Sequence, residues 1–341
     1  DEKILLEAVL KNANVNKGRP VKSVGREGVD YYNTLGYVPY DVGINENAAR
    51  TLEYAYADFT IALMAEQMNK PKISKRFYKQ SKNYINLFDE SSKLMRGRNK
   101  DGTFQSPFNP LKWGDAFTEG NSLHYSWSVF HDIQGLIDLM GGDSEFIGML
   151  DSVFTMPPKF DDSYYGFTIH EIREMQIVNM GNYAHGNQPI QHMIYLYNYA
   201  KQPWKAQDKV RNVMKKLYSA EPDGYCGDED NGQTSAWYVF SALGFYPVTP
   251  GVSQYVFGSP LFEKVTMSLQ NGKIFTIRSV DNSYDSHYIK SLKLNGTNYN
   301  NTWIGFDEIK KGGNLIFNMA NKPNKDFGVS NLSKPFSLSN K

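Results

Sequence analysis

Apolar residues recur at helical spacing through most of the first 250 positions. Between residues 2 and 14 the apolar positions lie three and four apart, and the same spacing continues over 47–68 through Leu52, Phe59 and Leu63. We predict further helices at 74–95, 122–140, 144–154, 190–201, 204–218 and 233–243. The last helix should end at Gly244, a common C-terminal signal, and residues 18–40 are expected to form a loop.

Three long segments between these helices are rich in Gly, Asn, Asp and aromatic residues. They cover 96–121, 157–188 and 220–232. Long loops that join regular elements tend to carry binding and catalytic groups. We therefore look for chemistry in these segments first.

After Pro250 the spacing changes from helical to alternating. Residues 265–269 and 274–278 alternate as strands around Asn271-Gly272, the strongest short signal for a hairpin. Two more strands are predicted at 289–294 and 315–319. The pattern predicts a mostly α protein, with a helical domain over 1–247 and an antiparallel β module over 251–341.

Composition narrows the classes of partner. The 341 residues include 37 Lys and Arg against 36 Asp and Glu, a net charge of +1, which excludes an electrostatic footprint for nucleic acid or an anionic membrane surface. No apolar run approaches the roughly 20 residues that a bilayer span needs. The single cysteine, Cys226, excludes an internal disulfide. The chain begins at Asp1 in helical pattern without a signal peptide, so we interpret it as processed or truncated.

The densest group of chemical side chains reads Gly-Asp-Glu-Asp-Asn-Gly-Gln over 227–233, directly before the last predicted helix. Acidic residues here can simply cap the helix. Three carboxylates exceed what a cap needs, and the helix N-terminus favours the ionised state required of a general base or a metal ligand. The EF-hand template is not met, because Val239 stands where its Glu belongs.

A second group, over 118–121, reads Thr-Glu-Gly-Asn and is followed by His124, Tyr125 and Trp127. One interpretation is that Glu119 does no more than complement a helix dipole. Among aromatic residues in a long loop, its carboxyl could instead hold a proton, as a general acid must. Two carboxyls of opposite protonation state are what glycoside hydrolysis needs.

A third group invites a metal interpretation. Its candidate zinc ligands are His170, Glu174, His185 and His192. The zincin motif is not met, because Glu174 stands where its second His belongs. The oxygen-rich side chains of Asn187, Gln188, Asp228 and Asp230 suit a hard cation such as calcium better.

Four stretches carry a family resemblance. They are Phe-Thr-Glu-Gly-Asn at 117–121, His-Asp-Ile-Gln-Gly-Leu-Ile at 131–137 with Met-Gly-Gly at 140–142, Asn-Gln-Pro at 187–189, and 227–247, where the acidic motif runs into Ser-Ala-Trp-Tyr-Val-Phe-Ser-Ala-Leu-Gly-Phe-Tyr-Pro. Together they resemble glycoside hydrolase family 92, bacterial calcium-dependent exo-acting α-mannosidases. The resemblance implies a partial (α/α)6 catalytic barrel over 1–247, an inverting mechanism and Ca²⁺ as cofactor.

The resemblance also implies roles. Glu119 would be the general acid and Asp230 the general base, with Asp228 as its companion or alternative. Their carboxyl groups would then lie roughly 6.5–9.5 Å apart. Asp230, Asp228, Asn187 and Gln188 would approach a calcium ion that bridges hydroxyls of the terminal mannose. Family members usually carry Glu where Gln188 stands, which leaves ligation there open.

Substrate contacts are implied as well. The His170-Glu171 pair resembles the one that contacts the leaving-group mannose in members acting on α-1,2 linkages, and Asn121 and Tyr125 are further candidate substrate-binding residues. The expected substrate is an α-mannoside glycan such as an N-glycan, and the expected location is periplasmic or secreted. Family members carry an N-terminal β-sandwich and the opening helices of the barrel, so the missing N-terminal half is an expected partner.

Two other functions stay open. A non-catalytic mannose- or glycan-binding protein could use the same aromatic, carboxylate-lined pocket. A zinc-dependent hydrolase is the second alternative.

Overall fold

The computed structural model describes residues 1–14 and 25–341. The chain divides into two compact units, of which unit 1 comprises 1–131 and 157–172, and unit 2 comprises 132–156 and 173–341. The predicted boundary at 247–251 falls inside unit 2 and stays a prediction. No helix in the described part of the chain is long and apolar enough to cross a bilayer.

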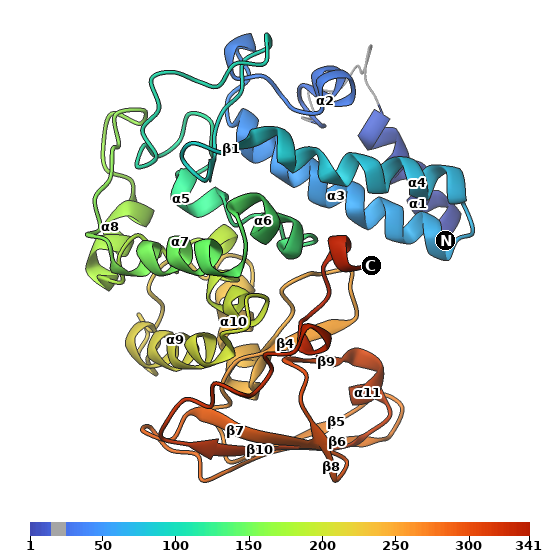
Figure 1. The fold of residues 1–341 in the computed structure, drawn as a ribbon, viewed down its shortest axis with the longest axis vertical. Coiled ribbons are helices and arrows are strands. Elements are labelled where there is room, and N and C mark those ends of the chain that lie inside the picture. Colours follow the sequence, from blue (N-terminus) through green and yellow to red (C-terminus); the bar gives the residue numbers. More distant parts are fainter. Residues whose placement is uncertain (15–24) are drawn as a thin grey trace. The chain divides into compact units, whose positions relative to one another are not determined.

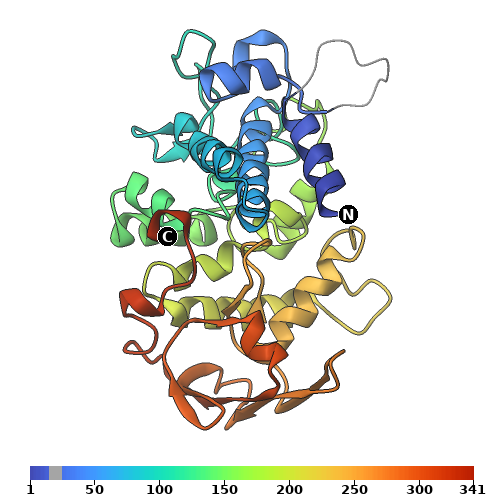
Figure 2. The same ribbon diagram turned by 90° about the vertical axis from the view of Figure 1, so that its right-hand side faces the viewer.

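Unit 1 is built on α3 (Asn47–Gln67), against which α4 (Pro71–Gln80) packs (Figures 1 and 2). α1 (Glu2–Asn14) contributes Ala13 to a small core with Ile61, Ala62 and Phe77. The unit also contains α2 (Val29–Leu35), η1 (Tyr40–Val42), η2 (Ser81–Leu87), the two-stranded pair β1 (Phe88–Asp89) and β2 (Leu94–Met95), and α5 (Ser122–Tyr125). The unit therefore presents its longest loop, 96–121, on a helical base.

Unit 2 contains a largely buried segment of 3₁₀ turns, η3 (Gln188–Ile190) and η4 (Met193–Asn198), and several helices. These helices are α6 (Ile133–Met140), α7 (Asp143–Thr155), α9 (Pro203–Leu217) and α10 (Gln233–Leu243). α8 (His170–Val178) begins in unit 1 and continues into unit 2. α9 packs on η4 and α10, so the loop before α10 has a rigid support.

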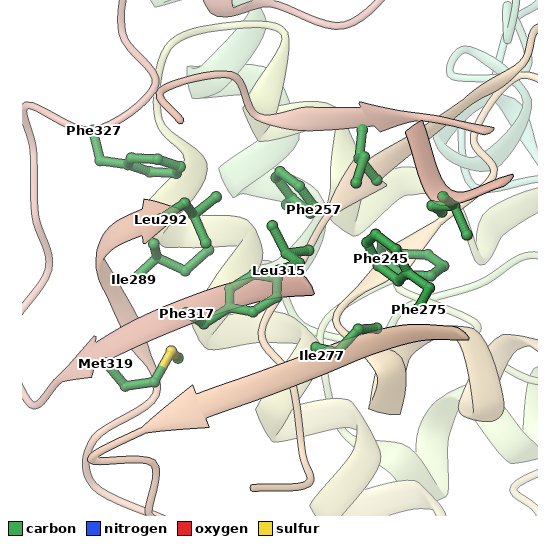
Figure 3. Packing of buried hydrophobic residues seen from close by; sticks show 12 residues of the cluster. Phe245, Phe257, Phe275, Ile277, Ile289, Leu292, Leu315, Phe317, Met319 and Phe327 are labelled. Carbon is green, nitrogen blue, oxygen red and sulfur yellow. The ribbon is translucent and has the colours of Figure 1, made fainter. Parts of the chain in front are cut away.

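The β module of unit 2 holds two sheets. The larger runs β5 (Lys264–Ser268), β6 (Ile274–Val280), β10 (Gly313–Ala320), β7 (Tyr288–Leu294) and β8 (Thr297–Tyr299), and the smaller runs β3 (Phe245–Tyr246), β4 (Gln254–Phe257) and β9 (Trp303–Gly305). α11 (Phe306–Lys310), η5 (Asn331–Ser333) and η6 (Leu338–Asn340) complete the unit. Figure 3 shows the core of the module, in which Phe257 meets Phe317 edge to face at 5.5 Å. The predicted mostly helical fold with a C-terminal β module is confirmed.

Helices at 2–14, 47–67, 143–155, 203–217 and 233–243 agree with the predicted ones, whereas other predicted helices are interrupted. The predicted helix at 74–95 ends at Gln80 and continues as a 3₁₀ turn and a strand pair. The one at 122–140 breaks before Asp132, whose carboxylate starts a new helix by accepting the Gly135 N–H. The one at 190–201 forms the 3₁₀ turn η4.

Three other expectations were wrong in part. The predicted loop at 18–40 contains α2, which left-handed glycines flank on both sides, and its residues 18–24 lie outside the described residues. The predicted loop at 157–188 contains α8. The β module is not purely antiparallel, because β10 runs parallel to β6. A local sequence pattern predicts the hairpin of β5 and β6. It does not predict that β10, which is distant in sequence, lies between β6 and β7.

Asp132 ties the C-terminal segment of unit 2 to α6. Its carboxylate accepts hydrogen bonds from the Ser337 hydroxyl at 3.0 Å, the Ser339 N–H at 2.8 Å and the Ser339 hydroxyl at 2.9 Å. Asp132 and Ser337 are buried, so removal of the carboxylate leaves at least the Ser337 hydroxyl without its partner in a site closed to solvent.

We predict that Asp132→Ala lowers the free energy of opening of residues 330–341 by about 2–4 kcal/mol, through the lost cap and the unpaired donors. Hydrogen exchange of the C-terminal peptide measures this change. The control is Asp138→Ala on the exposed side of the same helix, where Gln134 is the one donor to the carboxylate among the described residues. Equal exchange in the two variants would contradict the prediction.

Candidate active site

The loop that carries Glu119 in unit 1 is closed by backbone and aromatic contacts. The Gly114 N–H donates to the Gly120 carbonyl at 2.9 Å, and the Tyr125 hydroxyl donates to the Thr118 carbonyl at 2.7 Å. A Cβ on Gly120 would lie 2.9 Å from the Tyr125 ring, so this close approach requires glycine. Glu119 is exposed and has a φ of 44°, a left-handed conformation that costs a non-glycine residue about 1–3 kcal/mol.

Asn121 and Tyr125 are buried beneath this loop. The Asn121 side chain accepts the His124 N–H at 3.2 Å, and the His124 ring accepts the Asn121 N–H, which together cap α5. The Tyr125 ring stacks on Phe117 at 5.4 Å, and burial raises the pKa of Tyr125. Both residues shape the loop, and their contact with a substrate stays a prediction.

Tyr165 connects Glu119 to the His170-Glu171 pair within unit 1. Its hydroxyl accepts the Glu119 backbone N–H. Burial raises the pKa of Tyr165 to about 12, and the carboxylates of Glu119 and Glu171 add to the rise. Both carboxyl groups therefore lie within electrostatic reach of one phenol. The sequence analysis missed Tyr165, for which the only signal was its place in an aromatic-rich loop.

His170 and Glu171 form a pair at the start of α8. The His170 Nε2 lies 3.2 Å from the Glu171 Oε1, and the imidazole is 59% exposed while the carboxylate is 11% exposed. The other carboxylate oxygen, Oε2, has no hydrogen-bond partner among the described residues. An unpaired buried oxygen is costly, and a hydroxyl group of a ligand would satisfy it.

In unit 2, the acidic loop before α10 has a left-handed backbone at three successive residues. The φ angles are 55° at Asp230, 57° at Asn231 and 96° at Gly232. The Glu229 carboxylate accepts the Gly232 N–H at 2.7 Å and also the Ser235 hydroxyl. These hydrogen bonds lower the pKa of Glu229. Glu229 therefore performs the helix-start role that was the alternative interpretation for the whole cluster.

Asp230 faces the segment that carries Asn187 and Gln188. The Gln188 side-chain amide donates to the Asp230 Oδ2. Asn187 is buried, Asp230 is half-buried and Asp228 is exposed. The structure thus brings together two of the four predicted calcium ligands.

The donor set fits calcium in kind. Calcium takes six to eight oxygen ligands from carboxylates, amide and backbone carbonyls and water. Rotation of the Gln188 amide by a half-turn would present its oxygen beside the Asp230 carboxylate. Asn187 and the exposed Asp228 belong to the same two segments.

The zinc interpretation finds no site in the described residues. No three His, Cys, Asp or Glu side chains among residues 1–14 and 25–341 are grouped so as to hold a metal ion. The His185 ring nitrogens are both used, with Nδ1 2.6 Å from the Tyr183 hydroxyl and Nε2 2.7 Å from the Tyr218 hydroxyl. Burial lowers the pKa of His185 to about 3, so the imidazole is neutral between two phenols.

The predicted site residues divide between the two units. Unit 1 holds Glu119, Asn121, Tyr125, His170 and Glu171, and unit 2 holds Asn187, Gln188, Asp228 and Asp230. Within unit 1, the carboxylates of Glu119 and Glu171 both raise the pKa of Tyr165, and within unit 2, the Gln188 amide donates to the Asp230 carboxylate. A left-handed backbone marks both proposed catalytic residues, Glu119 and Asp230.

Comparison with known proteins gives a consistent result. A model of the glycosyl hydrolase family 92 catalytic domain matches residues 1–321. The family GH92 inverting mannosidase BT2199 of Bacteroides thetaiotaomicron VPI-5482 is 49% identical, with a TM-score of 0.89 over 99% of this chain and 46% of that chain. The family GH92 α-mannosidase BT3965 of Bacteroides thetaiotaomicron is 35% identical, with a TM-score of 0.86 over 99% of this chain and 42% of that chain.

A curated relative from Arthroderma benhamiae, described as an uncharacterized secreted glycosidase, is 27% identical over 99% of this chain and 44% of its own length. The chain thus spans less than half the length of each of these three relatives. The family match covers helices and β module alike. The chain belongs to glycosyl hydrolase family 92.

Proposed function

We propose that this chain carries the catalytic acid and base of an α-mannosidase that releases terminal mannose with inversion. The observation that carries the proposal is the contact of Asp230 with Gln188, in a chain whose two carboxyl-bearing motifs also place Glu119 and Asp230 in the left-handed region, a strained backbone for a non-glycine residue. Such strain persists where the surrounding contacts over-determine it, which is typical of functional positions. Two relatives above 30% identity are named as mannosidases, and one of them as inverting.

In this proposal the two residues act in opposite protonation states. The Glu119 carboxyl protonates the glycosidic oxygen as the bond to the leaving sugar breaks. Asp230, with Asp228 as its companion or alternative, accepts a proton from the water that attacks the anomeric carbon. The Asp230 carboxylate lies on the loop before α10. The left-handed backbone at Asp230 and the hydrogen bond that Glu229 accepts from Gly232 fix the shape of that loop.

Calcium is the proposed cofactor, held by Asp230, Asp228, Asn187 and Gln188. When bound, the cation would orient sugar hydroxyls and help to distort the ring. The contact between Gln188 and Asp230 supports this proposal because it already places an amide and a carboxylate together.

The proposed substrate is an α-1,2-linked mannoside, cleaved from its non-reducing end. The His170-Glu171 pair would contact the leaving-group sugar, and the unpartnered Glu171 Oε2 supports such a contact.

By analogy with the secreted fungal relative, we propose export, which recovery of the protein in the periplasm or the medium would test. We also propose that a further polypeptide, equivalent to the rest of the relatives, completes the sugar-holding wall.

We predict that the protein releases mannose from α-1,2-mannobiose and that the β-anomer forms first, as inversion requires. NMR of the nascent sugar measures this outcome, for residues 1–341 alone and for the chain joined to such a further segment. Binding of mannobiose without release in both forms would support a glycan-binding protein instead.

Replacing His170 and Glu171 by Ala should depress the turnover of α-1,2-mannobiose about 10-fold more than that of an activated aryl mannoside. A proportional loss on both substrates would contradict the linkage role.

We predict that Glu119→Gln removes most activity on a poor leaving group and much less on an activated one, because acid assistance matters in proportion to the basicity of the departing oxygen. Asp230→Asn should lose about 10²–10⁴-fold on both substrates, because the base acts on water. The ratio of kcat/KM on an alkyl and a dinitrophenyl α-mannoside measures the difference. The same ratio in both variants would refute the assignment.

We predict that chelation of calcium abolishes turnover and that added calcium restores it, because oxygen ligands select a hard cation. Asp230→Asn should also weaken calcium binding measured by calorimetry, whereas Glu229→Gln should leave it within about twofold, since Glu229 bonds to the start of α10. Restoration by zinc and not by calcium would overturn the proposal.

A further inference from the structure

Beneath the acidic loop of unit 2 lies a chain of buried hydrogen bonds that starts at Tyr183. The Tyr183 hydroxyl meets the His185 Nδ1 at 2.6 Å, the His185 Nε2 meets the Tyr218 hydroxyl at 2.7 Å, and the Tyr218 hydroxyl donates to the Thr234 carbonyl at 3.3 Å. Tyr183 and His185 are fully buried. Three separate stretches of sequence are therefore joined through one imidazole.

The last bond fixes the direction of the whole chain. A carbonyl oxygen can only accept, so the Tyr218 hydroxyl proton points to Thr234. The His185 Nε2 must then donate its proton to the Tyr218 oxygen, and the His185 Nδ1 must accept from Tyr183. Every donor finds an acceptor in this arrangement, and removing one hydroxyl leaves a buried ring nitrogen without a partner.

The chain ends on the loop that carries the proposed base. The Thr234 hydroxyl donates to the Asp228 carbonyl at 3.0 Å, and the Thr234 N–H donates to the Glu229 carbonyl at 3.2 Å. Thr234 is fully buried. The position of the Thr234 backbone therefore sets the backbone of Asp228 and Glu229.

Gln191 provides a second connection between the same two segments. Its side-chain amide donates to the His185 carbonyl at 3.2 Å, and its side-chain oxygen accepts from Gln233 at 3.2 Å. The Gln191 carbonyl accepts the Trp237 indole N–H at 3.0 Å. The segment with Asn187 and Gln188 is thus fastened to α10 on both sides of those two residues.

The two segments also approach each other at backbone distance. A Cβ on Gly227 would lie 3.0 Å from the Gly186 Cα, and a Cβ on either glycine would lie within 2.6 Å of the Glu174 carboxylate. Glycine at both positions allows the two backbones and the Glu174 carboxylate to come this close. The two segments are therefore in direct backbone contact at this point, and the hydrogen bonds of His185, Tyr218 and Gln191 act on both sides of it.

We propose that His185, through Tyr218 and with Gln191, is a positioning residue that holds the segment of Asn187 and Gln188 in register with the loop of Asp228 and Asp230. It touches neither substrate nor cation and acts by keeping the oxygen ligands and the general base in one fixed arrangement. This proposal rests on the proposed function.

The test removes one hydroxyl and preserves its ring. In Tyr218→Phe the ring keeps its stacking on Trp237, at 5.7 Å between centroids, while the bonds to His185 and Thr234 are lost. The control is Tyr197→Phe, which removes another buried phenol hydroxyl of unit 2, bonded to Asp151 on α7 and outside this network. Tyr183→Phe provides a second variant should Tyr218→Phe fold poorly.

We expect amide hydrogen exchange of residues 226–234 to accelerate about 3- to 10-fold in Tyr218→Phe, the effect of one buried hydrogen bond, and to stay unchanged in the control. We also expect kcat and the affinity for calcium alone to fall about 10-fold, with KM within about twofold, because outer partners of ligands tune affinity to this extent.

Unchanged exchange in the 226–234 peptide would overturn the proposal. Faster exchange with unaltered kcat and calcium affinity would overturn it as well, because the network would then be only structural. Absence of mannose release by the unaltered protein would refute the proposed function separately, and loop exchange with calcium titration would then decide the positioning role.

Discussion

Burial of tyrosine and tryptophan side chains whose polar groups pair with distant segments is the interaction on which much of this structure depends. Fully buried tyrosines and tryptophans occur in both units. In unit 1, the Tyr32 hydroxyl donates to the Asp58 carboxylate, which also pairs with Arg26. In unit 2, the Trp237 indole donates to the Gln191 carbonyl. Each pairing avoids a penalty of about 1–3 kcal/mol, and each joins elements that are distant in sequence.

A different constraint, the clustering of like charges before a helix, shapes the acidic loop of unit 2. Acidic residues before a helix serve as caps, and three of them in a row repel one another. In the structure the carboxylates have different partners. Glu229 accepts hydrogen bonds from Gly232 and Ser235 at the start of α10, whereas Asp230 has a left-handed backbone and accepts from the Gln188 amide.

How well an element could be predicted depended on how far apart in sequence its interacting residues lie. Helices such as 47–67 and 233–243 appeared with their bounds almost intact, because apolar spacing and terminal glycines are local signals. The break at Asp132 was missed, although an Asp that caps the helix start three residues before Gly135 is a local signal. The bonds that Ser337 and Ser339 donate to the same carboxylate, from some 200 positions away, carry no local signal. The insertion of β10 between β6 and β7 was equally hidden, since period-two alternation carries no strand order.

The sequence by itself determined the family, the chemical type of each candidate residue and the hairpin turns, since long motifs and turn residues are written in consecutive positions. It did not show that Glu119 and Glu171 both act electrostatically on the Tyr165 phenol, or that both ring nitrogens of His185 are used by Tyr183 and Tyr218. Only the tertiary structure decided these contacts. Which hydroxyl bonds to a buried ring nitrogen depends on how separate segments pack against one another. The spacing of residues along the chain does not encode the distance between such segments in space.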